Sequence, residues 1–396
     1  MKAQPKPEVP KEVSENKHVQ KAVLKSFGKR SLRRLRNIFL ASAVLSTGLQ
    51  YAPDLVSTKF DDYMKAQGYT ETYSDHFHTG EIRVYDRYNP LYPFHLAGKS
   101  VAITWNEAMK EQHVSYLALT LFTPQLYLDG LLKGFTDMLP FGSELDAYSI
   151  TTNDAPEKRT NFIRPPGQFS LNEFLRDFSG VEGRALEFAS DRDELRDVLF
   201  QFVMLHEARH GDQNRAAFAT TNESDADLYA FRVLSARGVD RALLNEAANI
   251  VIHARALNAT LAGDSGHAST FSMQRGGQRI FDAHQDAAAF DRLHTVLAEA
   301  DRRNDANFAP EVPIGNRYYY LTLAMNNEGL LNEDPGLRKA AVAFARSIEY
   351  FNNLSDGMII DPGFDLSGLD LDYLTKPYTP VPDKLQPPPR PPGAGV

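Results

Sequence analysis

The chain has 396 residues, of which 42% are hydrophobic and 24% are charged, so it resembles an ordinary globular protein in composition and is long enough to form a sizeable core. It contains no cysteine, which excludes disulfides, thiol nucleophiles and thiolate metal sites and leaves histidines and carboxylates as possible metal ligands. Residues 1–36 carry a formal charge of +8 and the remainder carries −16, and this acidic body argues against nucleic acid as a partner.

The first predicted element is the apolar run Ile38–Leu49, which follows the basic arm of residues 1–36. A basic region before an apolar segment of about 7–15 residues is typical of a secretory signal. A membrane span needs about 20 residues. We predict that residues 37–52 are a signal peptide or an anchor, and that the body is periplasmic or held at the inner membrane through residues 38–52. The alternative is a cytoplasmic protein with a basic disordered arm and an amphipathic helix.

Residues 53–180 are predicted to form a mixed N-terminal region. Glu81–Tyr85 alternates polar and apolar residues like a short strand. Trp105–Phe122 and Leu126–Phe141 have the periodicity of helices. Asp146–Phe169 is punctuated by proline, asparagine and glycine, so we expect an irregular connection there.

Residues 181–374 are predicted to be a helical region organised around His206-Glu207-Ala208-Arg209-His210, which is an HExxH motif after an apolar helical stripe. Residues four apart lie on one face of an α-helix, so His206 and His210 can direct ring nitrogens at one metal ion. Glu207 lies about 100° round the helix from His206. There its carboxylate can take a proton from a zinc-activated water without binding the metal. Gly211 is placed to end the helix as its C′ residue.

A catalytic zinc site needs a third protein ligand. Glu223, thirteen residues after His210, opens a second amphipathic run and is our candidate. Asp227 lies one helical turn further on, where it can accept a hydrogen bond from a ligand imidazole. The connection between His210 and Glu223 is short, which leaves Asp212, Asp225 and Asp227 as alternative ligands.

These residues resemble the gluzincin class of zinc metallopeptidases, which includes thermolysin-like enzymes and the HtpX-like membrane proteases. The resemblance implies that His206, His210 and Glu223 bind Zn²⁺, that Glu207 is the catalytic base and that Asp227 orients a ligand histidine. The sequence from Glu223 to Asp227 is similar to the ExEAD form of the HtpX-like group. The resemblance covers only about 35 of the 396 residues.

Further helices are predicted downstream of the motif, over Arg241–Leu261, Phe281–Arg303 and Leu337–Asn352. His267 lies between the first two on a Gly/Ser turn, and it is a candidate for stabilising an oxyanion during catalysis. The competing candidates for that role are His253, His284, His294 and Tyr318–Tyr320. Residues 375–396 are rich in proline and are predicted to be a disordered tail.

The sequence therefore predicts a mainly helical α+β protein with a zincin-like active-site helix, which acts as a zinc-dependent metallopeptidase on a peptide or protein substrate. HExxH constrains water activation more than substrate, so a zinc hydrolase of a non-peptide amide or ester is the second hypothesis. The third is an exported envelope protein that binds partners without catalysis. The sequence indicates no oligomeric state.

Overall fold

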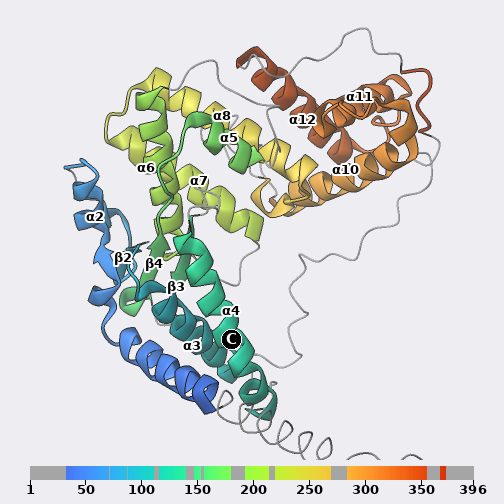
Figure 1. Cartoon of the computed structure of the whole chain (residues 1–396). Helices are drawn as coiled ribbons and strands as arrows, with labels where there is room; N and C mark the ends of the chain where they lie inside the picture. The colour runs from blue at the N-terminus through green and yellow to red at the C-terminus, as the bar shows by residue number, and fades with distance from the viewer. Residues whose placement is uncertain are drawn as a thin grey trace, which may run out of the picture. The chain divides into compact units, whose positions relative to one another are not determined.

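The computed structural model describes residues 33–70, 72–86, 88–110, 116–139, 147–152, 156–179, 192–213, 219–268, 283–354 and 366–371. These residues are mainly helical and include one four-stranded sheet (Figure 1), so the prediction of a mainly helical α+β fold is confirmed. Most of the basic arm and all of the Pro-rich tail lie outside the described residues.

The chain divides into two compact units that cut across the predicted boundary at residue 180. Unit 1 comprises residues 1–57 and 86–139, and unit 2 comprises residues 58–85 and 140–396. The division follows from the sheet. Strand β2 (Glu81–Tyr85) pairs with strand β4 (Thr160–Arg164), and this pairing joins the segment around β2 to the later part of the chain.

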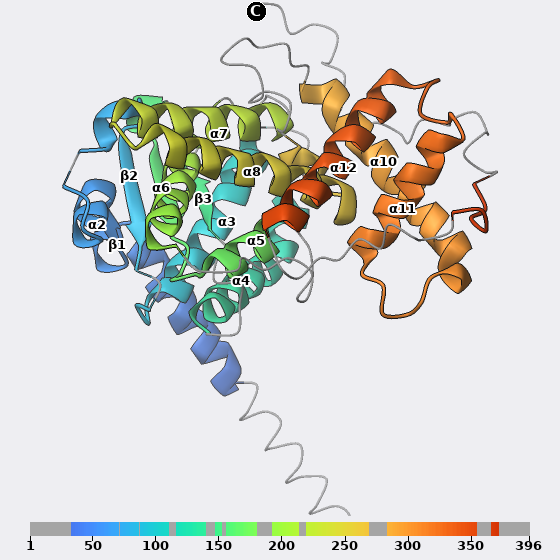
Figure 2. The same ribbon diagram turned by 90° about the horizontal axis from the view of Figure 1, so that it is seen from above.

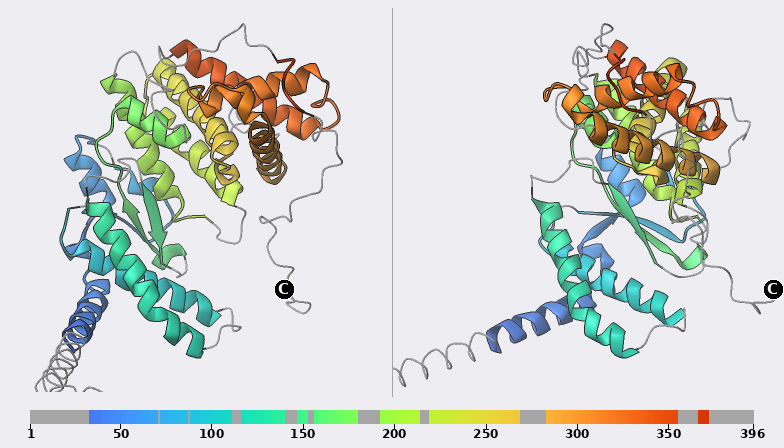
Figure 3. Two further views of the ribbon diagram at one scale, coloured as in Figure 1. Left: turned by 45° about the vertical axis from the view of Figure 1, so that its right-hand side comes forward. Right: turned by 90° about the vertical axis from the view of Figure 1, so that its right-hand side faces the viewer.

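The described part of unit 1 is helical and comprises a first helix over residues 33–50, then α3 (Tyr92–Lys110) and α4 (Tyr116–Met138), which pack against each other (Figure 3). The predicted helix boundaries in this region are wrong, because α4 continues through positions 122–126 and through Gly130. Gly130 serves close packing, since a Cβ atom there would lie 2.9 Å from the Cα atom of Ala97. Among the described residues, no helix has the length and apolar content needed to cross a membrane.

The sheet has the strand order β1-β2-β4-β3, with β1 at Ser57–Lys59 and β3 at Tyr148–Thr151. β4 runs parallel to β2 and antiparallel to β3. Two of these strands lie inside Asp146–Phe169, so the prediction of an irregular connection there was wrong. Pro165 directly follows β4, so it bounds the strand and does not interrupt it.

The helices of unit 2 surround α8, which contacts α5, α6, α7, α10 and α12 (Figure 2). α8 spans the predicted range, and the side chain of Asp240 caps it by accepting hydrogen bonds from the backbone N–H groups of Ala242 and Leu243. The predicted helices near the C-terminus are also present, whereas α11 was not predicted. The bounds are α2 Phe60–Ala66, α5 Leu171–Ser179, α6 Asp193–Arg209, α7 Ala219–Ala236, α8 Arg241–Leu261, α10 Ala283–Asn304, α11 Ile314–Asn327 and α12 Pro335–Leu354.

Candidate metal centre

The HExxH motif lies at the C-terminal end of α6. The apolar stripe that precedes it is buried, including Leu199 and Phe202 with no exposed surface and Val203 at 4%. Burial of side chains of this size stabilises the fold by roughly 1.5–3 kcal/mol each, so the core sets the rotation of α6 about its axis. His206 follows Phe202 by one turn and is directed inward, with 5% of its surface exposed.

Two side chains beside strand β4 hold the end of α6. Asn161 donates hydrogen bonds to the backbone carbonyls of Glu207 and Ala208, both at 3.1 Å, and Arg159 donates to the carbonyl of Gly211 at 3.3 Å. The last carbonyls of a helix lack its regular hydrogen bonds, and these side chains add to the bond that the carbonyl of Ala208 accepts from the N–H of Gly211. Gly211 ends the helix as predicted but does not have the left-handed backbone of a C′ glycine. A Cβ atom there would lie 2.9 Å from that of Asn161, so close packing requires the glycine.

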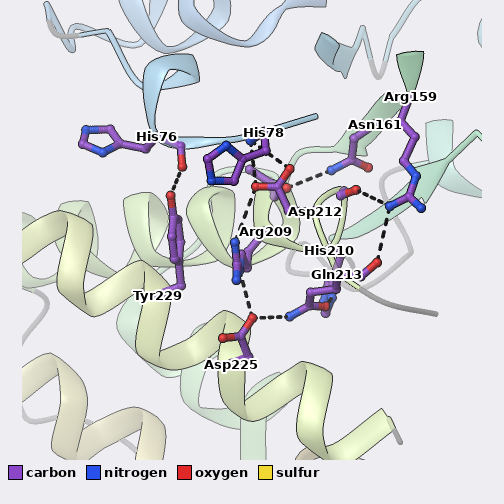
Figure 4. Close-up of polar contacts among 12 residues, drawn as sticks. His76, His78, Arg159, Asn161, Arg209, His210, Asp212, Gln213, Asp225 and Tyr229 are labelled. Carbon is purple, nitrogen blue, oxygen red and sulfur yellow. Dashed lines mark hydrogen bonds and ion pairs between the residues drawn. The ribbon is translucent and has the colours of Figure 1, made fainter. Parts of the chain in front are cut away.

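Arg209 joins the turn after α6 to the start of α7 (Figure 4). Its guanidinium lies 2.9 Å from Asp225 Oδ2 and 3.5 Å from Asp212 Oδ2, and it stacks over the ring of Tyr229 at 4.5 Å from the centroid. Asp212 also accepts the backbone N–H of His78 at 3.0 Å. Through these contacts, Asp212 and Asp225 stabilise the turn after α6.

The reversal brings Glu223 of α7 to the two histidines of the motif. Glu223 Oε2 lies 3.0 Å from His206 Nε2, and Glu223 Oε1 lies 3.5 Å from His210 Nε2. The two Nε2 atoms face each other at 3.1 Å. Within the described ranges, this is the only cluster of three His, Asp or Glu side chains whose ligand atoms come within metal-binding reach of one another, all within 4.8 Å.

Asp227 and Arg255 hold the imidazole of His206 in one orientation. Asp227 is fully buried, and its Oδ1 atom lies 2.8 Å from His206 Nδ1 and 3.0 Å from Arg255 Nη2. Arg255 in turn stacks over the ring of Phe178, 4.5 Å from its centroid. A carboxylate can only accept, so the proton of a neutral His206 ring lies on Nδ1 and its Nε2 lone pair faces Glu223 and His210.

Gln213 holds His210 in the equivalent way (Figure 4). Its amide NH₂ donates to the backbone carbonyl of Asn222 at 2.6 Å and to Asp225 Oδ2 at 3.2 Å. The amide oxygen therefore faces His210 Nδ1, which lies 2.6 Å away and must donate the hydrogen. The lone pair of His210 Nε2 is thus free to point at the centre of the cluster.

His267 also reaches the cluster. It lies in the short turn η4 (Ser265–His267), where its Nδ1 atom is 2.6 Å from Asp264 Oδ2 and its Nε2 atom is 3.3 Å from Glu223 Oε2. Asn258 of α8 donates to the same Asp264 oxygen at 3.0 Å. The structure therefore places the sequence candidate for oxyanion stabilisation beside the third predicted ligand.

The described competitors of His267 have structural partners of their own. His253 stacks on Tyr350 with ring centroids 4.2 Å apart, and its Nδ1 atom lies 2.9 Å from the hydroxyl of Ser347. His294 Nδ1 donates to the backbone carbonyl of Thr260 at 2.8 Å. Tyr319 is bonded to Glu349, and Tyr318 and Tyr320 are buried in α11. The side chain of His284 lies outside the described residues.

The carboxylates control the charge of the cluster. Burial lowers the pKa of His206, but Asp227 and Glu223 outweigh it and raise that pKa to about 10. Burial and Arg255 lower the pKa of His267, whereas Asp264 and Glu223 raise it to a net value of about 9. Burial raises the pKa of Glu223, but its two histidine neighbours hold that pKa well below the usual range. Without a metal, protonated histidines therefore neutralise Glu223.

The donor set fits Zn²⁺. Two neutral imidazole nitrogens and one carboxylate are the ligands of many catalytic zinc sites. Glu223 Oε2 is buried and accepts no well-aligned hydrogen bond, although His206 Nε2 lies 3.0 Å away. Buried polar atoms normally have partners, and a cation held by the three side chains would satisfy this oxygen. Zinc would take the place of the proton between the two facing Nε2 atoms.

Glu207 is partly exposed, and its carboxylate forms no hydrogen bond or ion pair with any residue that the structure describes. Its position next to His206 thus leaves the carboxylate free to exchange a proton. Arg255, Gln213, Asn161 and Asp264 were missed at the sequence level. Only Arg255 left a signal there, as a single charged residue within the apolar pattern of α8.

Comparisons of the chain with models of known protein families, with curated proteins and with solved structures found no significant match.

Proposed function

We propose that this chain is a zinc-dependent peptidase with a zincin-like site formed by α6 and α7. The observation that supports this most strongly is the convergence of His206, His210 and Glu223, with both histidines held so that their Nε2 atoms meet Glu223. A cluster that arose by chance would not need separate partners for each imidazole, such as Asp227 and Gln213.

Each residue has a role in this proposal. His206, His210 and Glu223 hold Zn²⁺, which when bound supplies a Lewis acid that makes water more acidic. Glu207, with its unpaired carboxylate, accepts a proton from the attacking water and delivers it to the leaving amine. Asp227, which is paired with Arg255, keeps His206 in the ligand tautomer.

His267 is proposed to donate a hydrogen bond to the negative oxygen that forms on the substrate carbonyl. Asp264 holds the proton on Nδ1, and its carboxylate 2.6 Å away favours the imidazolium form of His267, in which Nε2 also carries a proton. Loss of one such donor lowers kcat by roughly 10²–10³ in other hydrolases. His267→Ala should therefore lower kcat by that order and leave the zinc content unchanged. Loss of zinc in this variant would instead identify His267 as a fourth ligand.

The first test is the metal content of the purified full chain. We expect about one zinc per chain, lost in His206→Ala and retained in His294→Ala, a matched control outside the cluster. If the unsubstituted protein binds no zinc after reconstitution, the proposal fails and the protein is better described as a binding protein.

The second test separates catalysis from metal binding. Glu207→Gln should retain zinc and lose peptide cleavage by roughly 10²–10⁴-fold, the usual contribution of a general base. Glu194→Gln is the control, because Glu194 is an exposed carboxylate on the same helix. Cleavage of a peptide library that survives Glu207→Gln would contradict the proposal. Zinc binding without peptide cleavage, but with Glu207-dependent hydrolysis of simple esters or amides, would favour the non-peptide hydrolase.

A further inference from the structure

Large exposed hydrophobic residues are concentrated in unit 1. Fourteen such residues of the described chain belong to unit 1 and two, Ile314 and Val342, belong to unit 2. Those in unit 1 include Tyr51 at 84% exposure, Val44 at 73% and Leu121 at 70%. Single exposed apolar residues are normal in soluble proteins, but a concentration of this kind marks an interaction surface.

In α4 the exposed residues form a stripe along one face. Leu121, Leu128, Leu132 and Phe135 are spaced by seven, four and three residues, which places them on one side of the helix, and their exposures run from 45% to 70%. The opposite side is the buried one. There, a Cβ atom at Gly134 would lie 2.5 Å from the Cα atom of Pro93 in α3.

The inside of unit 1 combines buried leucines, such as Leu49 and Leu96, with polar and small residues at the helix contacts. The hydroxyl of Tyr127 in α4 is bonded to Ser42 and lies 2.7 Å from Ser46 Oγ, both in the first helix. Gly98 of α3 approaches the same helix, since a Cβ atom there would lie 2.8 Å from the carbonyl oxygen of Ser46. Small residues that let backbones approach, joined by hydroxyl bonds, are how helices pack when their surroundings are as apolar as their side chains.

The first helix indicates what kind of partner covers the exposed apolar side chains of unit 1. Its exposed Leu35, Leu40, Val44 and Leu45 point in directions that span an arc of roughly 220° at 100° per residue, so apolar side chains face outward over more than half of the helix circumference. A protein partner usually covers a narrow stripe of a helix, whereas the acyl chains of a bilayer can surround a wide apolar arc. The exposed Arg33, Arg34 and Arg36 begin this helix, and eight further Lys or Arg precede them. This basic segment complements anionic headgroups.

We propose that unit 1 is a membrane-docking unit whose α4 face and first helix insert into the interface of an anionic lipid bilayer. The described helices lack the apolar length of a span, so the unit lies within one interface, with the arginines at headgroup depth and the leucines among the acyl chains. Ser42 and Ser46 bind the first helix to Tyr127. The apolar segment is thus a folded part of the unit, which favours an anchor over a cleaved leader.

The test is flotation of the full chain with lipid vesicles. We expect the protein to float with phosphatidylcholine vesicles that contain phosphatidylglycerol. Leu128→Gln combined with Leu132→Gln and Phe135→Gln should reduce the bound fraction at least about ten-fold. Arg33→Gln combined with Arg34→Gln and Arg36→Gln should abolish the preference for the anionic vesicles and its sensitivity to salt.

The matched control is Ile314→Gln combined with Val342→Gln, which makes the same chemical change at exposed residues of unit 2 and should leave flotation unchanged. Circular dichroism of each variant verifies its helical content. The proposal is overturned if the unsubstituted protein stays in the soluble fraction with both vesicles. It is also overturned if light scattering shows a dimer that the α4 substitutions dissociate without any effect on lipid binding, because the stripe would then join two copies of the chain.

Discussion

The two units of this protein differ in how their helices pack and in what the helices expose. In unit 2, helix α6 buries Leu199 and Phe202. In unit 1, helix α4 packs through glycines such as Gly134 and exposes Leu132 at 66%. Each helix is amphipathic, but the face that packs differs. Removal of apolar surface from water stabilises both units, since unit 1 also buries Leu49, Leu96 and Leu119. The difference is that unit 1 adds close backbone packing at glycines and hydroxyl bonds, while it leaves many large apolar side chains exposed.

Buried charges in the core of unit 2 are paired with opposite charges, as Asp227 is with Arg255. Breaking this pair is expected to change the stability of the protein more than any other substitution considered. Arg255→Met removes the guanidinium that faces the buried Asp227 carboxylate, which should lower the free energy of unfolding by about 3–5 kcal/mol. Zinc affinity should fall roughly 10–100-fold, because Arg255 no longer fixes Asp227 in place beside His206. Urea denaturation and zinc titration measure the two effects. Arg232→Met, at an exposed position of α7, is the control. Equal stability of the two variants would contradict the ion-pair argument.

His253 makes the stability of unit 2 sensitive to acid. Burial, together with Arg346, lowers its pKa from 6.5 to about 4. The unfolded chain therefore takes up the proton first, and stability that is present above pH 6.5 is lost as the pH falls towards 4. At pH 4.5 this amounts to about 2–3 kcal/mol.

His253→Phe keeps the stacking position against Tyr350 and removes the titrating group. The difference in unfolding free energy between pH 7.5 and pH 4.5 should be smaller in this variant than in the unsubstituted protein by the same 2–3 kcal/mol. An unchanged pH dependence would mean that the pKa of His253 is the same in the folded and unfolded states.

Close packing in unit 1 can be tested with two glycines. Gly134→Ala places a Cβ atom 2.5 Å from the Cα atom of Pro93 and should destabilise the protein by about 1–3 kcal/mol. Gly48 lies in the first helix with no atom within 4 Å of the corresponding Cβ position. Gly48→Ala should therefore stabilise its helix by up to about 1 kcal/mol. Thermal unfolding followed by circular dichroism measures the stability of both variants. If Gly134→Ala also stabilised the protein, packing at Gly134 would be looser than proposed.

The smallest effect is expected on the exposed face of α4. Leu132→Gln removes an apolar side chain that is already 66% exposed, so the unfolding free energy in lipid-free buffer should change by no more than about 0.5 kcal/mol. Leu199→Gln in α6 is the positive control, because Leu199 is fully buried. A loss of more than about 2 kcal/mol in Leu132→Gln would mean that this face is buried in the free protein.

Local periodicity predicted much of unit 2. The spacing of apolar residues located α8 and the buried stripe of α6, because helix formation and burial leave a repeat that one stretch of sequence contains. The i, i+4 spacing of His206 and His210 likewise predicted their shared face. β3 and β4 escaped prediction, because strands are stabilised by pairing with residues far away in the chain, and the prolines that bound them resemble those of a loop.

The sequence by itself determined which side chains are available for chemistry: the histidines and carboxylates of HExxH and ExxxD, without any cysteine. Only the tertiary structure shows that Glu223 lies beside both histidines while Asp212 and Asp225 contact Arg209, because this placement depends on how the turn after α6 closes. It also decided that Arg255 supports Asp227, since the two lie on different helices. In α4 the sequence indicates two unlike faces, but periodicity is the same whichever face turns inward, and only packing against α3 decided that the glycines lie inside and the leucines outside.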